Sequence, residues 1–377
     1  MDVSVCVPYR DRLTNLRLAL ESLTRQSLSA DRIEVVIGAM EYSTDFLELC
    51  REYSDRLDLV AVVTGREFHI PHARNLAMRS ARRDVVVQMD ADTLLDEHAL
   101  KRVVANFEFG QRQCVLGQVV GYGNNQDGDV ADVQERNFDQ YAADLAAMAV
   151  SEEWPADPRF QVPHHVPWMF AWTGLVALMR RDVVEADLYF DESFRGWGVD
   201  DLEWGYRVCR AGIPIERRSE VYALHLPHQR DSKANEHTES RNYHRFLRKW
   251  PHRDVELARF LGDTEANQTW PDYRDFMDQF ASDGGLGVQV SRDRGGQITI
   301  VVGARRPIAG SDDHYWELTG MSLPFSDHEV ARCELDPRLG RLPSAFREAV
   351  VAEAQRVTAG SVAGADPTWG NASTPTA

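Results

Sequence analysis

The sequence predicts an α/β protein built on a mostly parallel sheet flanked by helices. Short apolar runs alternate with amphipathic helical stretches from the N-terminus to about residue 105. Such alternation is typical of parallel sheets joined by right-handed crossovers. One apolar run, Val85–Met89, continues directly into Asp90, Ala91 and Asp92. Because ligands bind beyond the carboxyl ends of parallel strands, this strand marks the expected functional site.

The individual elements follow from hydrophobic periodicity. In the first part of the chain we expect strands at residues 3–7, 34–38, 59–63 and 85–89, and helices at 13–23, 45–53, 71–78 and 96–105. Thr14 is a candidate N-cap for the first of these helices. Further along we expect a loop at 121–132, a helix at 132–150, an irregular segment at 153–167, a strand at 168–179, a helix at 202–210 ended by Gly212, and a strand at 220–224.

After about residue 251 the pattern changes. Helices are expected at 255–261, 272–280 and 344–357, with a strand at 297–302. The final stretch is rich in Ala, Gly, Ser, Thr and Pro, which favours disorder. We therefore expect a first domain at residues 1–250, which carries the expected functional site, a small α+β accessory region at 251–357 and a disordered tail at 358–377.

Composition narrows the class of protein. The chain has 377 residues and a formal net charge of −17, which argues against a nucleic-acid binder because such proteins neutralise phosphates. The five cysteines are scattered, so neither a disulfide framework nor a zinc site is indicated. No signal-peptide pattern follows Met1, and the longest apolar run, Trp168–Met179, is too short for a transmembrane segment. We expect a cytoplasmic protein, and the sequence does not indicate its oligomeric state.

The two aspartates after the strand have two interpretations. Two carboxylates beyond a strand end could hold a divalent cation that in turn binds a diphosphate. Alternatively, Asp90 and Asp92 could cap the helix expected shortly afterwards. The aspartates alone do not decide between the two.

Four stretches taken together point to a family. Pro8–Arg12 ends the first strand, His72–Asn75 opens a helix, Asp90–Asp92 ends a later strand, and Gly196–Glu203 leads into another helix. In this combination and order, residues 3–250 resemble the nucleotide-sugar-dependent glycosyltransferases of the A-type fold. The similarity is greatest to family 2-like enzymes and to the β-1,4-galactosyltransferase and chondroitin-polymerase type. The Trp-Gly-x-Asp-Asp pattern from Trp197 is its most specific part.

The resemblance implies a pocket for a UDP-sugar. The residues it assigns to that pocket are Pro8, Tyr9, Arg10, Arg12, Glu41, Arg74, Asp90, Ala91 and Trp197. Many family 2 enzymes carry Asp-Asp-Gly-Ser after the second strand, whereas this chain reads Ala-Met-Glu-Tyr-Ser from Ala39. Glu41 would have to replace the aspartate that contacts uracil, so the nucleotide base stays open.

The resemblance also implies a metal site. Asp92 would ligate the metal directly, and Asp90 would approach the metal or the ribose. The stretch that begins at His228 is similar to one whose histidine is a metal ligand in the galactosyltransferases, which favours His228 over His225 as the third ligand. Carboxylates with an imidazole favour manganese over magnesium, although either cation is compatible with the pattern.

Asp200 and Asp201 are the candidate catalytic carboxylates. An acceptor hydroxyl needs a base in the transition state, and a helix start favours an ionised carboxylate. One aspartate could cap the helix while the other faces the substrate, and the resemblance implies that Asp201 is the base. The expected function is a metal-dependent inverting glycosyltransferase of carbohydrate biosynthesis, which moves a sugar from a UDP-sugar to an acceptor hydroxyl.

Two other functions are compatible with parts of the sequence. A sugar-phosphate nucleotidyltransferase would also hold a nucleotide and a metal on an α/β sheet, but it would need a glycine-rich loop with a lysine, and residues 8–13 contain neither residue. A non-catalytic carbohydrate-binding protein could retain a transferase scaffold. The joint presence of Asp92, Asp201 and His228 argues against such a decayed site.

Overall fold

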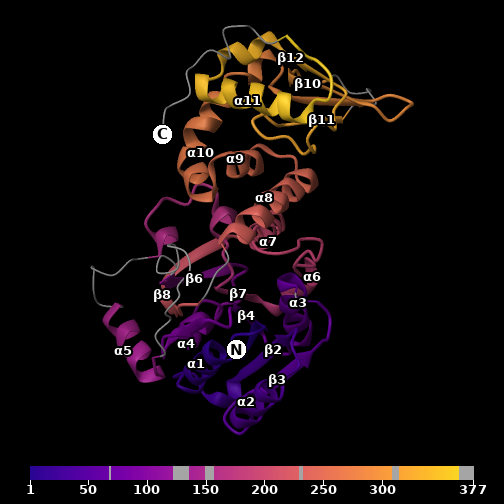
Figure 1. Ribbon diagram of the computed structural model, residues 1–377. Coiled ribbons are helices and arrows are strands. Elements are labelled where there is room, and N and C mark those ends of the chain that lie inside the picture. The colour runs from indigo at the N-terminus through magenta and orange to yellow at the C-terminus, as the bar shows by residue number, and fades with distance from the viewer. Residues whose placement is uncertain (68, 122–135, 149–156, 229–231, 308–313, 365–377) are drawn as a thin grey trace. The chain divides into compact units, whose positions relative to one another are not determined.

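The computed structural model describes residues 1–67, 69–121, 136–148, 157–228, 232–307 and 314–364 (Figure 1). The chain divides into two compact units, residues 1–239 and 240–377. The division falls within helix α8 (Ser232–Lys249), ahead of the domain boundary that we placed at residue 250.

An eight-stranded mixed sheet forms the centre of the first unit, with the strand order β3-β2-β1-β4-β7-β6-β8-β5 (Figure 1). Its strands are β1 (Val3–Tyr9), β2 (Ile33–Ala39), β3 (Asp58–Val63), β4 (Val85–Met89), β5 (Thr93–Leu95), β6 (Cys114–Val120), β7 (Leu175–Met179) and β8 (Ile215–His225). Strands β3, β2, β1 and β4 pair in parallel, as do β6 and β8. Strand β7 is antiparallel to both β4 and β6, and β5 is antiparallel to β8.

Helices cover both faces of this sheet. They are α1 (Leu13–Thr24), α2 (Thr44–Ser54), α3 (Ile70–Ser80), α4 (Ala99–Ala105), α5 (Phe138–Met148), α6 (Arg180–Glu185) and α7 (Asp200–Arg210), with short 3₁₀ turns at Ala30–Arg32, Pro158–Phe160 and Pro167–Phe170. Val5 shares one core with Leu16 of α1 and Phe46 of α2. On the opposite face α3 approaches closely, because a Cβ added to Gly38 would lie 1.9 Å from the carbonyl oxygen of Ala73. The expected α/β architecture is confirmed.

Several details differ from the sequence prediction. The apolar run at 168–179 is a strand only from Leu175, because Pro167–Phe170 forms a 3₁₀ turn first. Strand β8 begins at Ile215 rather than residue 220. Thr14 is not the cap of α1, whose N-cap is Arg12 without a side-chain hydrogen bond. Most of the loop expected at 121–132 lies outside the described residues.

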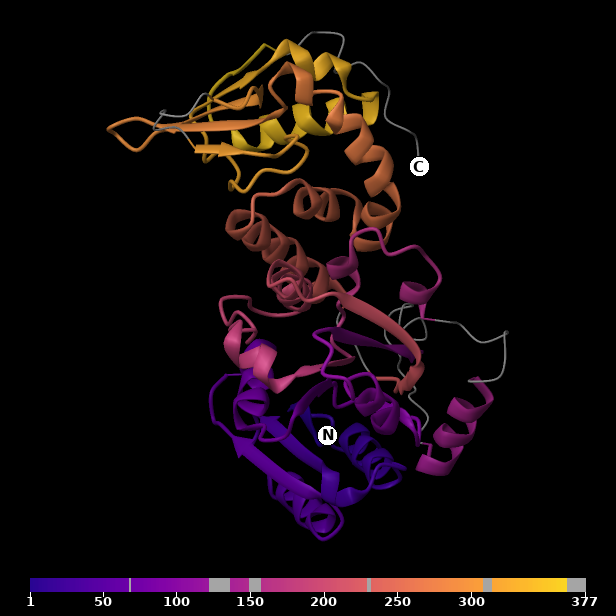
Figure 2. The same cartoon turned by 180° about the vertical axis from the view of Figure 1, so that it is seen from behind.

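The second unit combines helices with a five-stranded sheet of order β11-β9-β10-β12-β13. Its elements are α9 (Arg253–Leu261), α10 (Asp263–Asp278), β9 (Gly287–Arg292), β10 (Ile298–Ala304), β11 (His314–Trp316), β12 (Arg332–Leu335), α11 (Ser344–Val357) and β13 (Val362–Ala363), with 3₁₀ turns at Ala281–Asp283 and Pro337–Arg341. The connection between β9 and β10 projects from the unit (Figure 2).

The tail expected from residue 358 does not begin there. Thr358 is buried, and the amide of Ala359 donates to the carbonyl of Val330 over 2.8 Å. Strand β13 then pairs in parallel with β12. Residues 358–364 therefore belong to the second unit, so the prediction of disorder is wrong for them, and residues 365–377 lie outside the described chain. No helix in the described ranges is long and apolar enough to cross a bilayer.

Candidate active site

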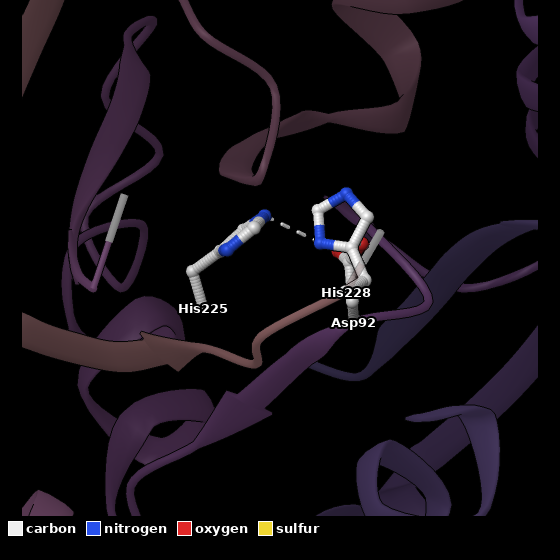
Figure 3. A group of neighbouring side chains, drawn as sticks. All are labelled: Asp92, His225 and His228. Atoms are coloured by element: carbon white, nitrogen blue, oxygen red, sulfur yellow. Dashed lines mark ion pairs between the residues drawn. The ribbon is translucent and has the colours of Figure 1, made fainter. Parts of the chain in front are cut away.

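Asp92, His225 and His228 form a buried group where β8 ends and just before β5 begins (Figure 3). His225 Nε2 lies 3.7 Å from Asp92 Oδ1, and His228 Nδ1 lies 3.6 Å from Asp92 Oδ2. The three potential ligand atoms all lie within 4.8 Å of one another. The structure therefore brings both candidate histidines close to Asp92, whereas the sequence favoured His228 over His225.

Backbone pairing explains why these residues meet. Asp92 immediately precedes β5, and the antiparallel pairing of β5 with β8 places Thr93 opposite His225. The amide of Leu226 donates to the carbonyl of Asp92 over 2.7 Å, so the chain beyond β8 is held beside Asp92. The side chain of Asn15 donates to the carbonyl of Pro227 over 3.3 Å and secures the turn that carries His228.

Strand β5 begins directly after Asp92, so the alternative prediction that the two aspartates cap the next helix is wrong. Asp90 and Asp92 do not cap the following helix, because α4 begins only at Ala99 and its N-cap is His98. Their side chains have other partners. Asp92 lies in the three-residue group, whereas Asp90 lies outside it.

The surroundings of Asp92 favour its charged form. Burial opposes ionisation, but His225, Arg12 and His228 hold the pKa of Asp92 below its usual value. The Arg12 guanidinium contacts Asp92 Oδ2, while Asp92 Oδ1 accepts no hydrogen bond from any described residue. A buried ionised carboxylate with an unsatisfied oxygen beside two imidazoles fits a divalent transition-metal ion such as manganese.

Asp90 lies outside that group and pairs with Arg74 instead. The Arg74 side chain is buried on α3 and bonds to two carboxylates: its Nη2 lies 3.2 Å from Asp90 Oδ1, and its Nη1 lies 2.8 Å from Asp200 Oδ2. Its guanidinium also lies 4.9 Å from the ring centroid of Phe190. The structure thus places Asp90 against Arg74 and not among the potential metal ligands, and it commits Arg74 to carboxylates within the protein.

Helix α7 begins with an unusual backbone. Its N-cap is Val199, which has φ +73° and makes no side-chain capping bond. A β-branched residue rarely adopts this left-handed conformation, which costs energy that the surroundings must supply. Neither Asp200 nor Asp201 is therefore the N-cap that we expected one of them to be. Asp200 instead bonds to Arg74, and Asp201 Oδ1 accepts the amide of Leu202 over 2.9 Å.

The pKa of the Asp201 carboxyl lies near neutral pH. Burial and the neighbouring charge of Asp200 raise the pKa of Asp201 to about 7, although Arg74 opposes that increase. Burial likewise raises the pKa of Asp200, again against the charge of Arg74. A carboxylate with a pKa near the working pH is suited to general base catalysis.

Helix α3 also holds the segment that leads to α7. The Asn75 side chain accepts the amide of Phe190 over 2.7 Å and donates to its carbonyl over 2.9 Å. His72 Nδ1 lies 3.0 Å from a carboxylate oxygen of Glu192, and His69 Nε2 lies 2.6 Å from the carbonyl of Phe194. From the sequence we gave a role only to Arg74 in this helix. These positioning contacts were missed because their partners lie in a distant segment.

Trp197 lies on the glycine-rich loop between that segment and α7. It is 40% exposed, and its backbone bonds twice to the Thr238 hydroxyl, donating through N and accepting through O at 3.1 Å each. A Cβ on Gly196 would lie 2.6 Å from the Thr238 side chain, so glycine is needed for this contact. The exposed indole remains a candidate contact for a ligand.

The other predicted nucleotide residues lie in three kinds of environment. Tyr9 is 1% exposed and its ring stacks on Phe46 at 4.7 Å, and Ala91 is also part of the core. Arg12 reaches Asp92, and Glu41 accepts the amide of Asp11 over 2.7 Å. The remaining positions are Pro8, which is partly buried at the end of β1, and Arg10, which is exposed and pairs with Asp11.

An α/β sheet with a candidate metal group and a carboxylate pair at its edge agrees with the A-type glycosyltransferase fold that we expected from the sequence. Residues 4–153 match the family model described as glycosyl transferase family 2. This match confirms, over residues 4–153, the resemblance to glycosyltransferases inferred from the sequence. The family match favours this class over the nucleotidyltransferase alternative.

Curated relatives and a solved structure show the extent of the similarity. Validoxylamine A glucosyltransferase from Streptomyces hygroscopicus subsp. jinggangensis is 29% identical over 262 residues, covering 66% of this chain and 61% of that protein. Hyaluronan synthase from Pasteurella multocida is 24% identical over 239 residues, covering 59% of this chain and 24% of that protein. The chain thus spans about three fifths or less of these relatives. A mannosyltransferase structure from Pyrobaculum calidifontis, in complex with GDP-Man and Mn²⁺, aligns with a TM-score of 0.48 and 18% identity over 75% of this chain and 76% of that one.

Proposed function

We propose that the protein is a metal-dependent inverting glycosyltransferase that moves a sugar from a UDP-sugar to an acceptor hydroxyl. The observation that carries this proposal is the ion-pair bridge through Arg74. Its two partners are Asp90, two residues before the metal-group carboxylate Asp92, and Asp200, the neighbour of Asp201. Arg74 therefore links two carboxylates that are close in sequence to the candidate metal ligand and to the candidate base.

Asp92, His225 and His228 are the residues that would hold the cation. A divalent cation at this group would neutralise the negative charge of the departing diphosphate. The charges around Asp92 keep that carboxylate ionised and ready to act as a ligand. Manganese suits this oxygen and nitrogen donor set better than magnesium does.

Asp201 is the proposed general base. It takes the proton of the acceptor hydroxyl as the acceptor oxygen forms its bond to the anomeric carbon. The bond between that carbon and the diphosphate oxygen breaks on the opposite face, so the anomeric configuration inverts. The pKa of about 7 for Asp201 supports this role, because the carboxylate can accept a proton without being fully protonated at neutral pH.

The donor is proposed from the family resemblance. Glu41 is the residue that would contact the nucleotide base, and one of its carboxylate oxygens accepts the amide of Asp11 in the loop after β1. The curated relatives are named as a glucosyltransferase and a hyaluronan synthase, which supports a sugar donor and a carbohydrate acceptor.

We further propose that residues 1–250 form the catalytic domain, that 251–357 are accessory to it, and that the protein acts in the cytoplasm.

A nucleotide-release assay tests the function. Purified protein is incubated with UDP- and GDP-sugars, a mixed acceptor pool and Mn²⁺, and the released nucleoside diphosphate is measured alongside the glycosylated product. We expect release that depends on both acceptor and metal. Pyrophosphate release from a nucleoside triphosphate and a sugar phosphate would instead indicate a nucleotidyltransferase, and ligand binding without any release would indicate a non-catalytic protein.

A further inference from the structure

The cationic side chain of Arg12 contacts the candidate metal group, which consists of Asp92, His225 and His228. The Arg12 guanidinium contacts Asp92 Oδ2, the same oxygen that lies 3.6 Å from His228 Nδ1. Asp92 is only 2% exposed, so this contact neutralises a buried charge. A divalent cation ligated by Asp92 would therefore meet the positive charge of Arg12 at short range.

The backbone of Arg12 is fixed while its side chain is accessible. Arg12 is the N-cap of α1, and its carbonyl accepts the amide of Leu16 over 2.9 Å. On the preceding side, the Asp11 amide donates to Glu41 over 2.7 Å, which holds Asp11 at φ +53°. The Arg12 side chain is nevertheless 40% exposed. Rotation of this side chain alone could thus release Asp92 without moving the loop.

We propose that Arg12 is a resident counter-ion of Asp92 that gives way to the metal and then binds the donor diphosphate. This inference rests on the proposed function of the site. Guanidinium and metal repel each other because both are cations a few ångströms apart. A diphosphate offers the released guanidinium a new anionic partner, which its planar donor fork can bind through two oxygens.

The exchange has a thermodynamic consequence. Without a diphosphate, the Arg12 guanidinium stays in contact with Asp92. A metal ion that binds alone must either displace this guanidinium or lie close to its positive charge, so it binds weakly. When a diphosphate is present, Arg12 has a favourable position outside the metal group, and the metal binds more tightly. Metal and diphosphate therefore strengthen each other's binding, and the coupling is the same from either direction.

Titration calorimetry with Mn²⁺ and inorganic pyrophosphate tests this proposal without requiring turnover or knowledge of the base. In Arg12→Ala, we expect Mn²⁺ alone to bind more tightly, by a factor on the order of ten, because one nearby positive charge is lost. Pyrophosphate in the presence of Mn²⁺ should bind more weakly by a similar factor. The wild type should show strong mutual enhancement, and Arg12→Ala should show less.

Matched variants isolate the effect of Arg12. Arg17→Ala removes an arginine of the same helix that pairs with Glu52, and it should leave both affinities unchanged. Arg12→Lys keeps the charge, so its affinity for Mn²⁺ alone should stay close to that of the wild type. Arg12→Gln removes the charge but keeps a polar side chain, and it repeats the test if Arg12→Ala proves unstable in a melting assay.

The outcomes separate this inference from the proposed function. If wild type binds Mn²⁺ and Asp92→Asn does not, the metal site stands. If Arg12→Ala and Arg12→Gln then bind Mn²⁺ no more tightly than wild type, the counter-ion proposal is wrong while the metal site remains. If wild type shows no Mn²⁺ binding even with pyrophosphate, the metal-dependent function itself is contradicted.

Discussion

Arg74 on α3 donates to Asp200 on α7 at 2.8 Å, and the two residues are both buried. The same guanidinium reaches Asp90 beyond β4, so a single side chain joins three elements that are distant in sequence. This contact fixes the start of α7, where Asp201 lies, relative to the strand end that leads to Asp92. We regard Arg74 as a positioning residue rather than a nucleotide contact.

Arg74→Met should destabilise the protein and lower activity. Removing one partner of a buried ion pair leaves uncompensated charge, which typically costs about 3–5 kcal/mol. Chemical denaturation should show that the free energy of unfolding decreases by an amount of that order. The kcat should fall because Arg74 no longer holds Asp200 at the start of α7, next to Asp201. Arg79→Met, an exposed position on the same helix, is the control and should change stability much less. Equal stability of the two variants would contradict the structural role of Arg74.

The pH profile should report the titration of Asp201. The pKa of this carboxyl is raised to about 7, and a general base acts in its deprotonated form. The value of kcat/KM should therefore increase as the pH rises through about 7 and fall about tenfold for each unit below it. Asp201→Asn should lose this acidic limb in its residual activity. Persistence of the same limb in Asp201→Asn would assign it to another group.

Chelation should abolish transfer. EDTA is expected to remove the cation held by Asp92, His225 and His228, and added Mn²⁺ should restore the initial rate. His225→Ala and His228→Ala should each weaken Mn²⁺ binding about 10- to 100-fold or more, since each loses a donor from a small ligand set. His98→Ala is the control, because the side chain of this histidine is about half exposed and lies outside the metal group. Full activity in metal-free buffer would rule out the assigned metal group.

The C-terminal end of the described chain should contribute to stability. Deleting residues 358–377 removes the buried Thr358 and strand β13, so the melting temperature should fall by several degrees. Deleting only residues 365–377 retains every described contact and serves as the matched control. If both truncations melt at the same temperature, the pairing of β13 with β12 does not contribute measurably.

The sequence could predict the strand ends and their carboxylates because these depend on local patterns. The apolar run Val85–Met89 predicts a buried strand, and Asp92 follows that strand closely in the sequence. The sheet position of β7 could not be read in the same way, because periodicity does not say which strands pair. Tyr9 continues the alternation of Val3, Val5 and Val7, and this pattern already indicated the place in the core that the structure gives it.

The long-range ion pairs were inaccessible to the same reasoning. Arg12 and Asp92 are separated by 80 positions, and Arg74 and Asp200 by 126. The sequence contains 59 acidic residues, so charge alone does not select the partner of either arginine. The strained N-cap at Val199 was missed for a related reason, since valine carries no local signal for a left-handed conformation.

The most direct test of the proposed mechanism compares Asp92→Asn with Asp201→Asn, using Mn²⁺ and UDP titrations alongside initial rates of transfer. Asp92→Asn should lose Mn²⁺ binding and the Mn²⁺-dependent part of UDP binding. Asp201→Asn should retain both affinities, while turnover falls by about 10²–10⁴ because the base is lost. If Asp201→Asn turns over at the wild-type rate while remaining folded, Asp201 is not the base and the proposed mechanism is wrong.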